Sequence, residues 1–203
     1  FFNETVTDAL DTDPIDVNVS HTKVSILKHA VAFDEKLLLF SDQTQFILTG
    51  GASLSPGSVS VNVTTEYDTL DTVSPVGSGN NVFFAFNKGQ FTGVREMYVE
   101  SDGETNQGED ITANIPKYVP SDIFKFAIAS NENILVTLSS KTGQLNSLYI
   151  YQWFFANSKR LQSSWHKWTI GDANDTTILN VDFIGTTLYL VVERSDGVYI
   201  ETL

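Results

Sequence analysis

The chain has 203 residues, of which 41% are hydrophobic and 18% charged, and it contains no cysteine. It can therefore bury a core, and it has neither disulfides nor thiolate metal sites to stabilise it. Its formal net charge of −13 opposes tight binding to DNA or to an anionic membrane, because phosphate groups would be repelled.

The first segment, residues 1–23, is polar and acidic, and we expect it to run extended into the first strands. Aspartates between Asp8 and Asp16 surround a turn at Pro14. Carboxylate oxygens suit calcium, but the spacing fails the EF-hand loop and lacks its central glycine. A solvated acidic loop is therefore favoured, with a metal ion in Asp8–Asp16 as the open alternative. The chain starts with phenylalanine and shows no signal peptide, which favours an internal piece of a longer protein.

Residues 24–203 carry a strand-pair unit that recurs along the chain. Aligning Leu37, Val82, Ile134 and Leu188 gives spacings of 45, 52 and 54 residues. Each of these residues lies in an apolar run that a polar turn precedes and a second strand-like stretch follows. Helix signals are poor, and periods of this size with several short strands are typical of β-propeller blades. We predict an all-β, propeller-like repeat of about four units, closed on itself or part of a larger ring, because an open fragment leaves edge strands bare.

The segments between these units carry weaker signals. The valines of residues 59–63 alternate with polar residues and predict a strand with one wet face. A turn is expected at residues 75–81, and an exposed acidic loop at Ser101–Asp110. Glu109–Pro116 is expected to form one helical turn that proline limits. A further strand is expected around Trp165–Ile170.

No catalytic, cofactor-binding or metal-binding residue is predicted. Ser78 lies in a Gly-Ser-Gly segment that lacks the spacing of a nucleophile elbow, and no phosphate-binding loop is present in the sequence. The acidic pairs Asp34/Glu35 and Glu109/Asp110 are adjacent only in sequence, whereas glycosidase geometry is set in space. No apolar run approaches the roughly 18 residues of a membrane helix.

The histidines show no metal-ligand spacing; they are His21, His29 and His166. His29 lies inside an apolar stretch and is expected to be packed or hydrogen-bonded at the edge of the core. We therefore expect a protein that is not an enzyme and needs no cofactor.

An aromatic cluster between Trp153 and Trp168 surrounds Lys159 and Arg160. Such a cluster suits the stacking of sugars or bases. The favoured alternative is that alternate residues, such as Trp153 and Phe155, fill a core between repeat units.

Several blocks of the sequence, in chain order, resemble the tail tubular protein B family, the nozzle proteins of T7-like podophages. The blocks are DPID (Asp13–Asp16), VSILKHAVAFDEKLLLFSDQTQFILTG (Val24–Gly50), LSPGSV (Leu54–Val59), TTEYDT (Thr64–Thr69), PVGSGNNVFFAF (Pro75–Phe86), GEDITANIPKYVP (Gly108–Pro120) and SSWHKWTIG (Ser163–Gly171). The resemblance covers essentially the whole chain, and family members are several times longer.

The resemblance implies a structural virion protein of the phage tail. Its relatives form a hexameric nozzle below the gatekeeper ring of tail tubular protein A, tail fibres attach at the junction, and the genome leaves through the channel without specific binding. An acidic chain suits such a channel, because repelled DNA can slide. The polar segments Ser101–Asp110 and Gly171–Thr177 are candidates for contact with fibres or the host outer membrane.

A second hypothesis belongs to another class of protein. The aromatic cluster with nearby carboxylates would suit a propeller-type protein that binds or hydrolyses bacterial surface polysaccharide, although that link rests on analogy between folds. The structural hypothesis is favoured.

Overall fold

The fold is all-β. The computed structural model describes residues 13–19, 25–33, 36–51, 54–99, 106–156 and 159–203, and within these ranges it contains strands and no helix. The strands form four antiparallel sheets, which we call sheets A to D in chain order.

Each sheet is a meander in which neighbouring strands follow one another in the chain. Sheet A holds β1 (His29–Phe33), β2 (Lys36–Phe40), β3 (Gln45–Thr49) and β4 (Ser60–Thr65). Sheet B holds β5 (Val76–Ser78), β6 (Asn81–Lys88), β7 (Phe91–Val99) and β8 (Asn106–Asp110). Sheet C holds β9 (Ile123–Ala129), β10 (Ile134–Ser139), β11 (Ser147–Ala156) and β12 (Lys159–Thr169). Sheet D holds β13 (Thr177–Ile184), β14 (Thr187–Arg194) and β15 (Gly197–Thr202).

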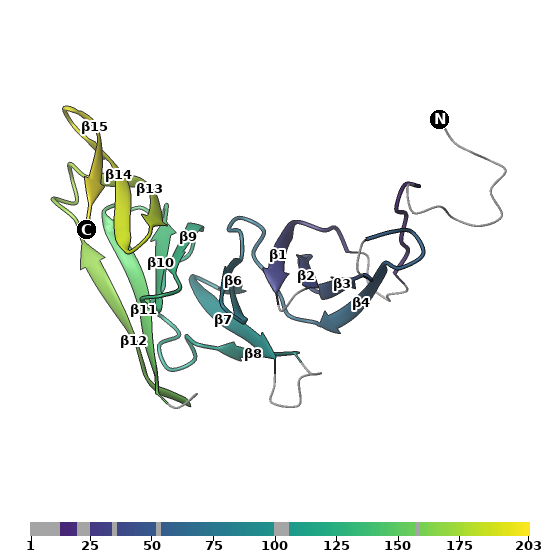
Figure 1. The fold of residues 1–203 in the computed structure, drawn as a ribbon. Coiled ribbons are helices and arrows are strands. Elements are labelled where there is room, and N and C mark those ends of the chain that lie inside the picture. The colour runs from purple at the N-terminus through teal and green to yellow at the C-terminus, as the bar shows by residue number, and fades with distance from the viewer. Residues whose placement is uncertain (1–12, 20–24, 34–35, 52–53, 100–105, 157–158) are drawn as a thin grey trace.

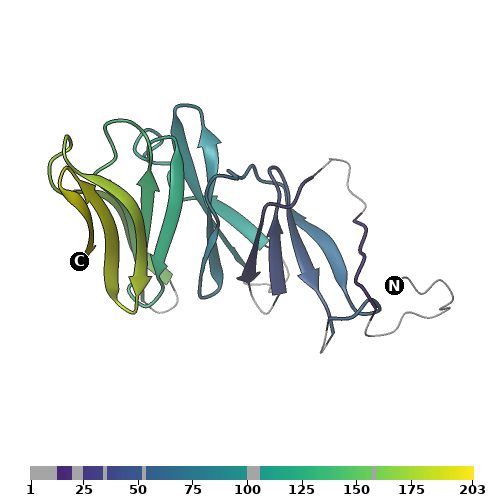
Figure 2. The same ribbon diagram turned by 90° about the horizontal axis from the view of Figure 1, so that it is seen from above.

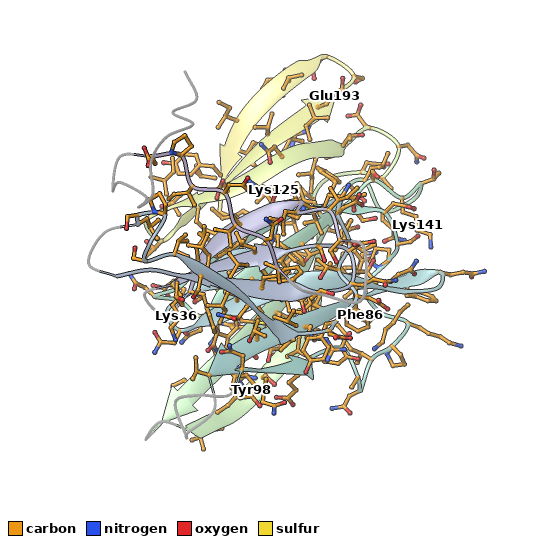
Figure 3. The ribbon with its side chains drawn as sticks, turned by 90° about the vertical axis from the view of Figure 1, so that its right-hand side faces the viewer. Lys36, Phe86, Tyr98, Lys125, Lys141 and Glu193 are labelled. Carbon is orange, nitrogen blue, oxygen red and sulfur yellow. The ribbon has the colours of Figure 1, made fainter. Side chains whose placement is uncertain are left out.

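The sheets stand side by side in an open row that follows their order in the chain (Figures 1 and 2). Figure 3 looks along this row, with Lys36 on sheet A, Phe86 on sheet B, Lys125 on sheet C and Glu193 on sheet D. Contacts between strands of different sheets join A to B, B to C and C to D.

Three apolar layers hold the row together, one between each pair of neighbouring sheets. The A–B layer contains Phe33, Leu38, Phe40, Val82, Phe84 and Met97. The B–C layer contains Val73, Phe83, Ala85, Val94, Val119, Ile123, Phe126, Leu135, Tyr151 and Trp153. The C–D layer contains Ala127, Val136, Leu138, Leu148, Ile150, Ile178, Val181, Leu188, Leu190 and Val192.

The apolar runs of the second strands follow from this stacking. In β6, Val82 and Phe84 enter the A–B layer while Phe83 and Ala85 enter the B–C layer. Side chains of a strand alternate between its two faces, so a strand covered on both faces needs an unbroken apolar run. The spacing that the sequence shows is therefore the spacing of second strands.

The four repeat anchors each lie in the second strand of a sheet: Leu37 in β2, Val82 in β6, Ile134 in β10 and Leu188 in β14. The prediction of an all-β chain with four repeat units is confirmed at this level. Each unit, however, is a whole sheet rather than a strand pair.

Two local predictions were wrong, and a third was right only in part. Asn106–Asp110, expected within an exposed loop, forms the edge strand β8; residues 101–105 of that loop lie outside the described part of the chain. The expected helical turn at Glu109–Pro116 is a non-helical turn after β8. Within residues 75–81, where a turn is expected, Val76–Ser78 forms β5, and Gly79 and Asn80 form a turn that leads into β6. In β5 and β8, main-chain pairing with a neighbouring strand overrides weak local propensity.

Candidate functional site

The aromatic cluster lies at the interface of sheets B and C. The Trp153 ring is buried, and its centroid lies 5.0 Å from that of Phe83 on β6 and 5.4 Å from that of Tyr151. Trp165 lies 5.2 Å from Tyr151, and its indole nitrogen donates a 3.0 Å hydrogen bond to the Ile111 carbonyl. These rings fill the layer between two sheets, as the packing hypothesis predicted.

The remaining aromatic residues of the cluster do not join this layer. Phe154 is 57% exposed and Trp168 is 43% exposed, because both point to the opposite face of sheet C, beyond the reach of sheet B. The side chains of Phe155 and Lys159 lie outside the described part of the structure.

A buried ion pair crosses the same interface. The side chain of Glu96 on β7 is fully buried, and its Oε1 accepts hydrogen bonds from Arg160 on β12 and, at 2.5 Å, from Asn81 Nδ2 on β6. Glu96 Oε2 has no hydrogen-bond partner among the described residues. Burial raises the pKa of the Glu96 carboxyl, and the bonds from Arg160 and Asn81 oppose this rise. This pair could not be predicted from the sequence, because its members lie 64 positions apart.

A second charged cluster closes the end of sheet B. Lys88 Nζ lies 2.6 Å from Asp110 Oδ2, and Asp110 Oδ1 accepts hydrogen bonds from the Thr112 hydroxyl at 2.6 Å and the Thr112 backbone at 2.9 Å. Burial alone would raise the pKa of Asp110, but the hydrogen bonds from Lys88 and Thr112 hold it below its ordinary value. The cluster joins β6, β8 and the following turn.

Glu109 and Asp110 do not form a catalytic pair. Glu109 is aligned with Glu96 and Asp110 with Arg95 on β7, so the two side chains point to opposite faces of β8. The other predicted pair, Asp34 and Glu35, lies outside the described residues.

Two adjoining hollows share Asn133 and Trp153: the first opens where sheets B and C meet, and the second is lined by sheet C and its β9–β10 turn. One, of about 520 Å³, is lined by Ser78, Gly79, Asn80, Asn81, Ser130, Asn131, Asn133 and Trp153. The other, of about 380 Å³, is lined by Glu132, Asn133, Gln152, Trp153, Phe154, Gln162 and Ser164. Their walls are mainly amides and hydroxyls, and Glu132 is the only ionisable group in either lining. Such walls can form hydrogen bonds, but they present no nucleophile beside a base.

The other candidate residues fall at separate places. His29 Nε2 lies 3.2 Å from the Asp71 carbonyl oxygen and Nδ1 lies 3.3 Å from Ser74 Oγ, which confirms the expected hydrogen-bonded role. His166 lies on β12, and Ser78 ends β5. His21, Asp8 and Asp11 lie outside the described residues. In the described ranges, His, Asp and Glu side chains form no group of three able to hold a metal ion, and no helix could span a membrane.

A family model described as "Bacteriophage nozzle protein" matches residues 1–203. The chain belongs to this family. A curated relative of this nozzle chain is the tail tubular protein gp12 of Escherichia phage T7, which is 33% identical over 201 residues. That match covers 98% of the chain and 25% of the relative, so the chain spans about a quarter of that relative's length.

Solved structures also match the nozzle chain. Two structures of Hsv2 from Kluyveromyces lactis have TM-scores of 0.48 and 0.49, each with 12% identity. They cover 84% and 83% of this chain, and 47% and 46% of their own chains.

Family membership establishes the general role of the protein and its location in the virion. The chain is part of a structural nozzle protein in the tail of a phage virion. This agrees with a site built from packing, ion pairs and amide-lined hollows.

Proposed function

We propose that this chain forms part of the wall of a hexameric short-tail nozzle, through which phage DNA passes into the host. The observation that carries the proposal is the nozzle-family match over residues 1–203, together with 33% identity to a tail tubular protein. The partners would be further copies of the protein, the gatekeeper ring of tail tubular protein A and the tail fibres.

The distribution of charge supports a conduit. The net charge is −13, and the described part of the chain exposes many carboxylates. They include Asp42, Asp68, Asp71, Glu109, Asp122, Glu132, Asp172, Asp182, Glu193 and Asp196. A lining of this sign repels phosphate groups and lets DNA slide without specific binding.

The arrangement of sheets supports a propeller-like body. We infer that residues 24–203 form one repeat domain whose four sheets act as blades, preceded by the acidic segment 1–23. The supporting observations are four meander sheets in chain order and, within the described ranges, apolar layers only between neighbouring sheets. A rigid stack of this kind would offer loops at its rim for contact with fibres or with the host outer membrane.

No catalytic role is proposed. The glycan hypothesis drew on the aromatic cluster, but Trp153 and Trp165 pack within the B–C layer instead of forming an open stacking platform. The structural role therefore stands as the single proposed function.

Mass photometry of the full-length protein tests the assembly, alone and mixed with tail tubular protein A. A discrete hexameric species, or one that forms only with the partner, is the expected result. A monomer under both conditions would overturn the proposal. Filter binding with duplex DNA at about 0.15 M salt adds a second readout, in which the assembled ring should not retain DNA.

A further inference from the structure

Sheet D is one strand shorter than the other sheets. Sheets A, B and C each have four strands, whereas sheet D has three and ends at β15. In the complete sheets, the third strand is covered by the strand that follows it in the chain: β3 by β4, β7 by β8 and β11 by β12. In the same order, β15 is the third strand of sheet D, and the described residues contain no fourth strand that pairs with it.

The backbone of β15 shows which groups face the open edge. Leu188 and Leu203 exchange both backbone hydrogen bonds, at 3.1 and 2.9 Å. Hydrogen-bonded pairs alternate with non-bonded pairs in an antiparallel ladder, so Tyr199 and Glu201 also bond to β14. The N–H and C=O groups of Val198, Ile200 and Thr202 therefore point away from β14, toward the open edge.

The side chains of β15 also lack the features that protect a true edge. Val198 is 58% exposed and Ile200 is 76% exposed, and Ile184 on β13, on the same face, is 69% exposed. Proteins usually protect an open edge with lysine, proline or a bulge, and β15 has none of these. Its one charged residue, Glu201, forms an ion pair with Arg194 on β14, on the face turned toward sheet C.

We propose that the edge of β15 binds a fourth, antiparallel strand of the same protein, the strand that follows Leu203 in the longer chain. In each of the three four-stranded sheets, the strand that follows the third strand in the chain pairs with it. The matched relative is about four times as long as the matched stretch, so chains of this family hold further segments. The described amino-terminal segment 13–19 lies at the opposite end of the row and cannot reach β15 in this arrangement (Figure 1). The proposal depends on strand pairing alone and holds whether or not the protein forms a nozzle.

Hydrogen exchange of the full-length protein tests the pairing. The amides of Val198, Ile200 and Thr202 should exchange as slowly as those of Tyr199 and Glu201. Fast exchange at the first three positions, alternating with slow exchange at the other two, would mean an open edge and would overturn the proposal.

A proline variant tests the same edge by removing one outward N–H group. In the full-length protein, Ile200→Pro should speed exchange at Val198 and Thr202 by roughly fivefold or more, because a ladder hydrogen bond is lost. Ile200→Thr, which keeps the N–H group, is the matched control and should leave exchange unchanged. Slow exchange at Leu190 in both variants shows that sheet D stays folded, and unchanged protection in Ile200→Pro would contradict the pairing.

A disulfide scan identifies the strand that binds. The 203 residues contain no cysteine, so Ile200→Cys introduces a single thiol within them. Cysteines placed one at a time in roughly the 20 residues after Leu203 span the expected hairpin and strand. An intrachain disulfide is expected at the position directly opposite residue 200, because only directly opposed cross-strand pairs fall within disulfide range. A disulfide between two chains, or none at any position, would overturn the assignment.

Discussion

At the residue scale, the clearest feature is a carboxylate buried without full compensation. Glu96 is fully enclosed between sheets B and C, and among the described residues Arg160 supplies its only cationic hydrogen-bond partner. Such a pair stabilises the fold little more than a well-packed apolar pair would. Removing one partner, however, leaves an unpaired charge in the core. Glu96 and Arg160 thus fix how sheet B meets sheet C.

Arg160→Met should therefore destabilise the protein by about 3–5 kcal/mol in urea unfolding at neutral pH. The loss should shrink as the pH falls toward 4.5, the ordinary pKa of a glutamate. A folded-state pKa raised above that value gives stability that is present at low pH and lost as the pH rises through it. The double variant Glu96→Leu/Arg160→Met should recover most of the loss; a double variant no more stable than Arg160→Met would contradict this account.

Asp110 should respond to pH in the opposite direction. Its folded-state pKa lies below the ordinary 3.8, so its stabilising contribution is present above pH 3.8 and is lost as the pH falls through the lowered value. Asp110→Asn should cost about 1 kcal/mol at neutral pH and should flatten the acid limb of the stability curve. Urea unfolding from about pH 6 to about pH 2.5 measures both. Parallel curves for the two proteins would rule out this role for Asp110.

At the scale of elements, the hairpin of β6 and β7 depends on a glycine beneath an aromatic ring. Phe86 and Gly93 are directly opposed, and a Cβ atom at Gly93 would overlap the Phe86 ring. The same ring lies 4.9 Å from the Arg95 guanidinium, which also lies 4.2 Å from the Tyr67 ring. The glycine lets the ring lie flat on the sheet and complete this stack.

Gly93→Ala should therefore destabilise the protein by about 1–3 kcal/mol, because the ring must leave its position or the strands must separate. Gly57→Ala is the matched control, since its Cβ would have no heavy atom within 4 Å. Thermal unfolding of both variants measures the difference. Equal melting temperatures for the two variants would show that Phe86 moves aside at no cost.

At the scale of the whole molecule, the main contacts between sheets in the described part of the chain join neighbours in the row. Stability in such an array is approximately a sum of local terms, as in repeat proteins. Damage in one layer should then stay near that layer.

Leu38→Ala tests this locality, because Leu38 is fully buried in the A–B layer. The change should cost about 2–5 kcal/mol of local stability. Hydrogen exchange should become faster in sheet A and the facing strands of sheet B, with sheets C and D unchanged. A uniform rise in exchange across all four sheets would mean that the row unfolds as one unit.

The sequence predicted the repeat because second strands such as β6 are buried on both faces and so carry unbroken apolar runs. It could not reveal β8, whose residues Asn106–Asp110 have low strand propensity. That strand is held by main-chain bonds to β7 and by Arg95, which donates to the Gly108 carbonyl at 2.8 Å. The Glu96–Arg160 pair was equally hidden, since only the stacking of sheets B and C brings its members together.

The stacking of the sheets also has a mechanical consequence. Force applied along the row acts on the three apolar layers in series. The layer with the fewest buried apolar residues should therefore separate first. Among the described residues, the A–B layer has six buried apolar residues, whereas the other two layers have ten each. Under tension, sheet A should therefore separate from sheet B first, while sheets B, C and D stay folded and packed together.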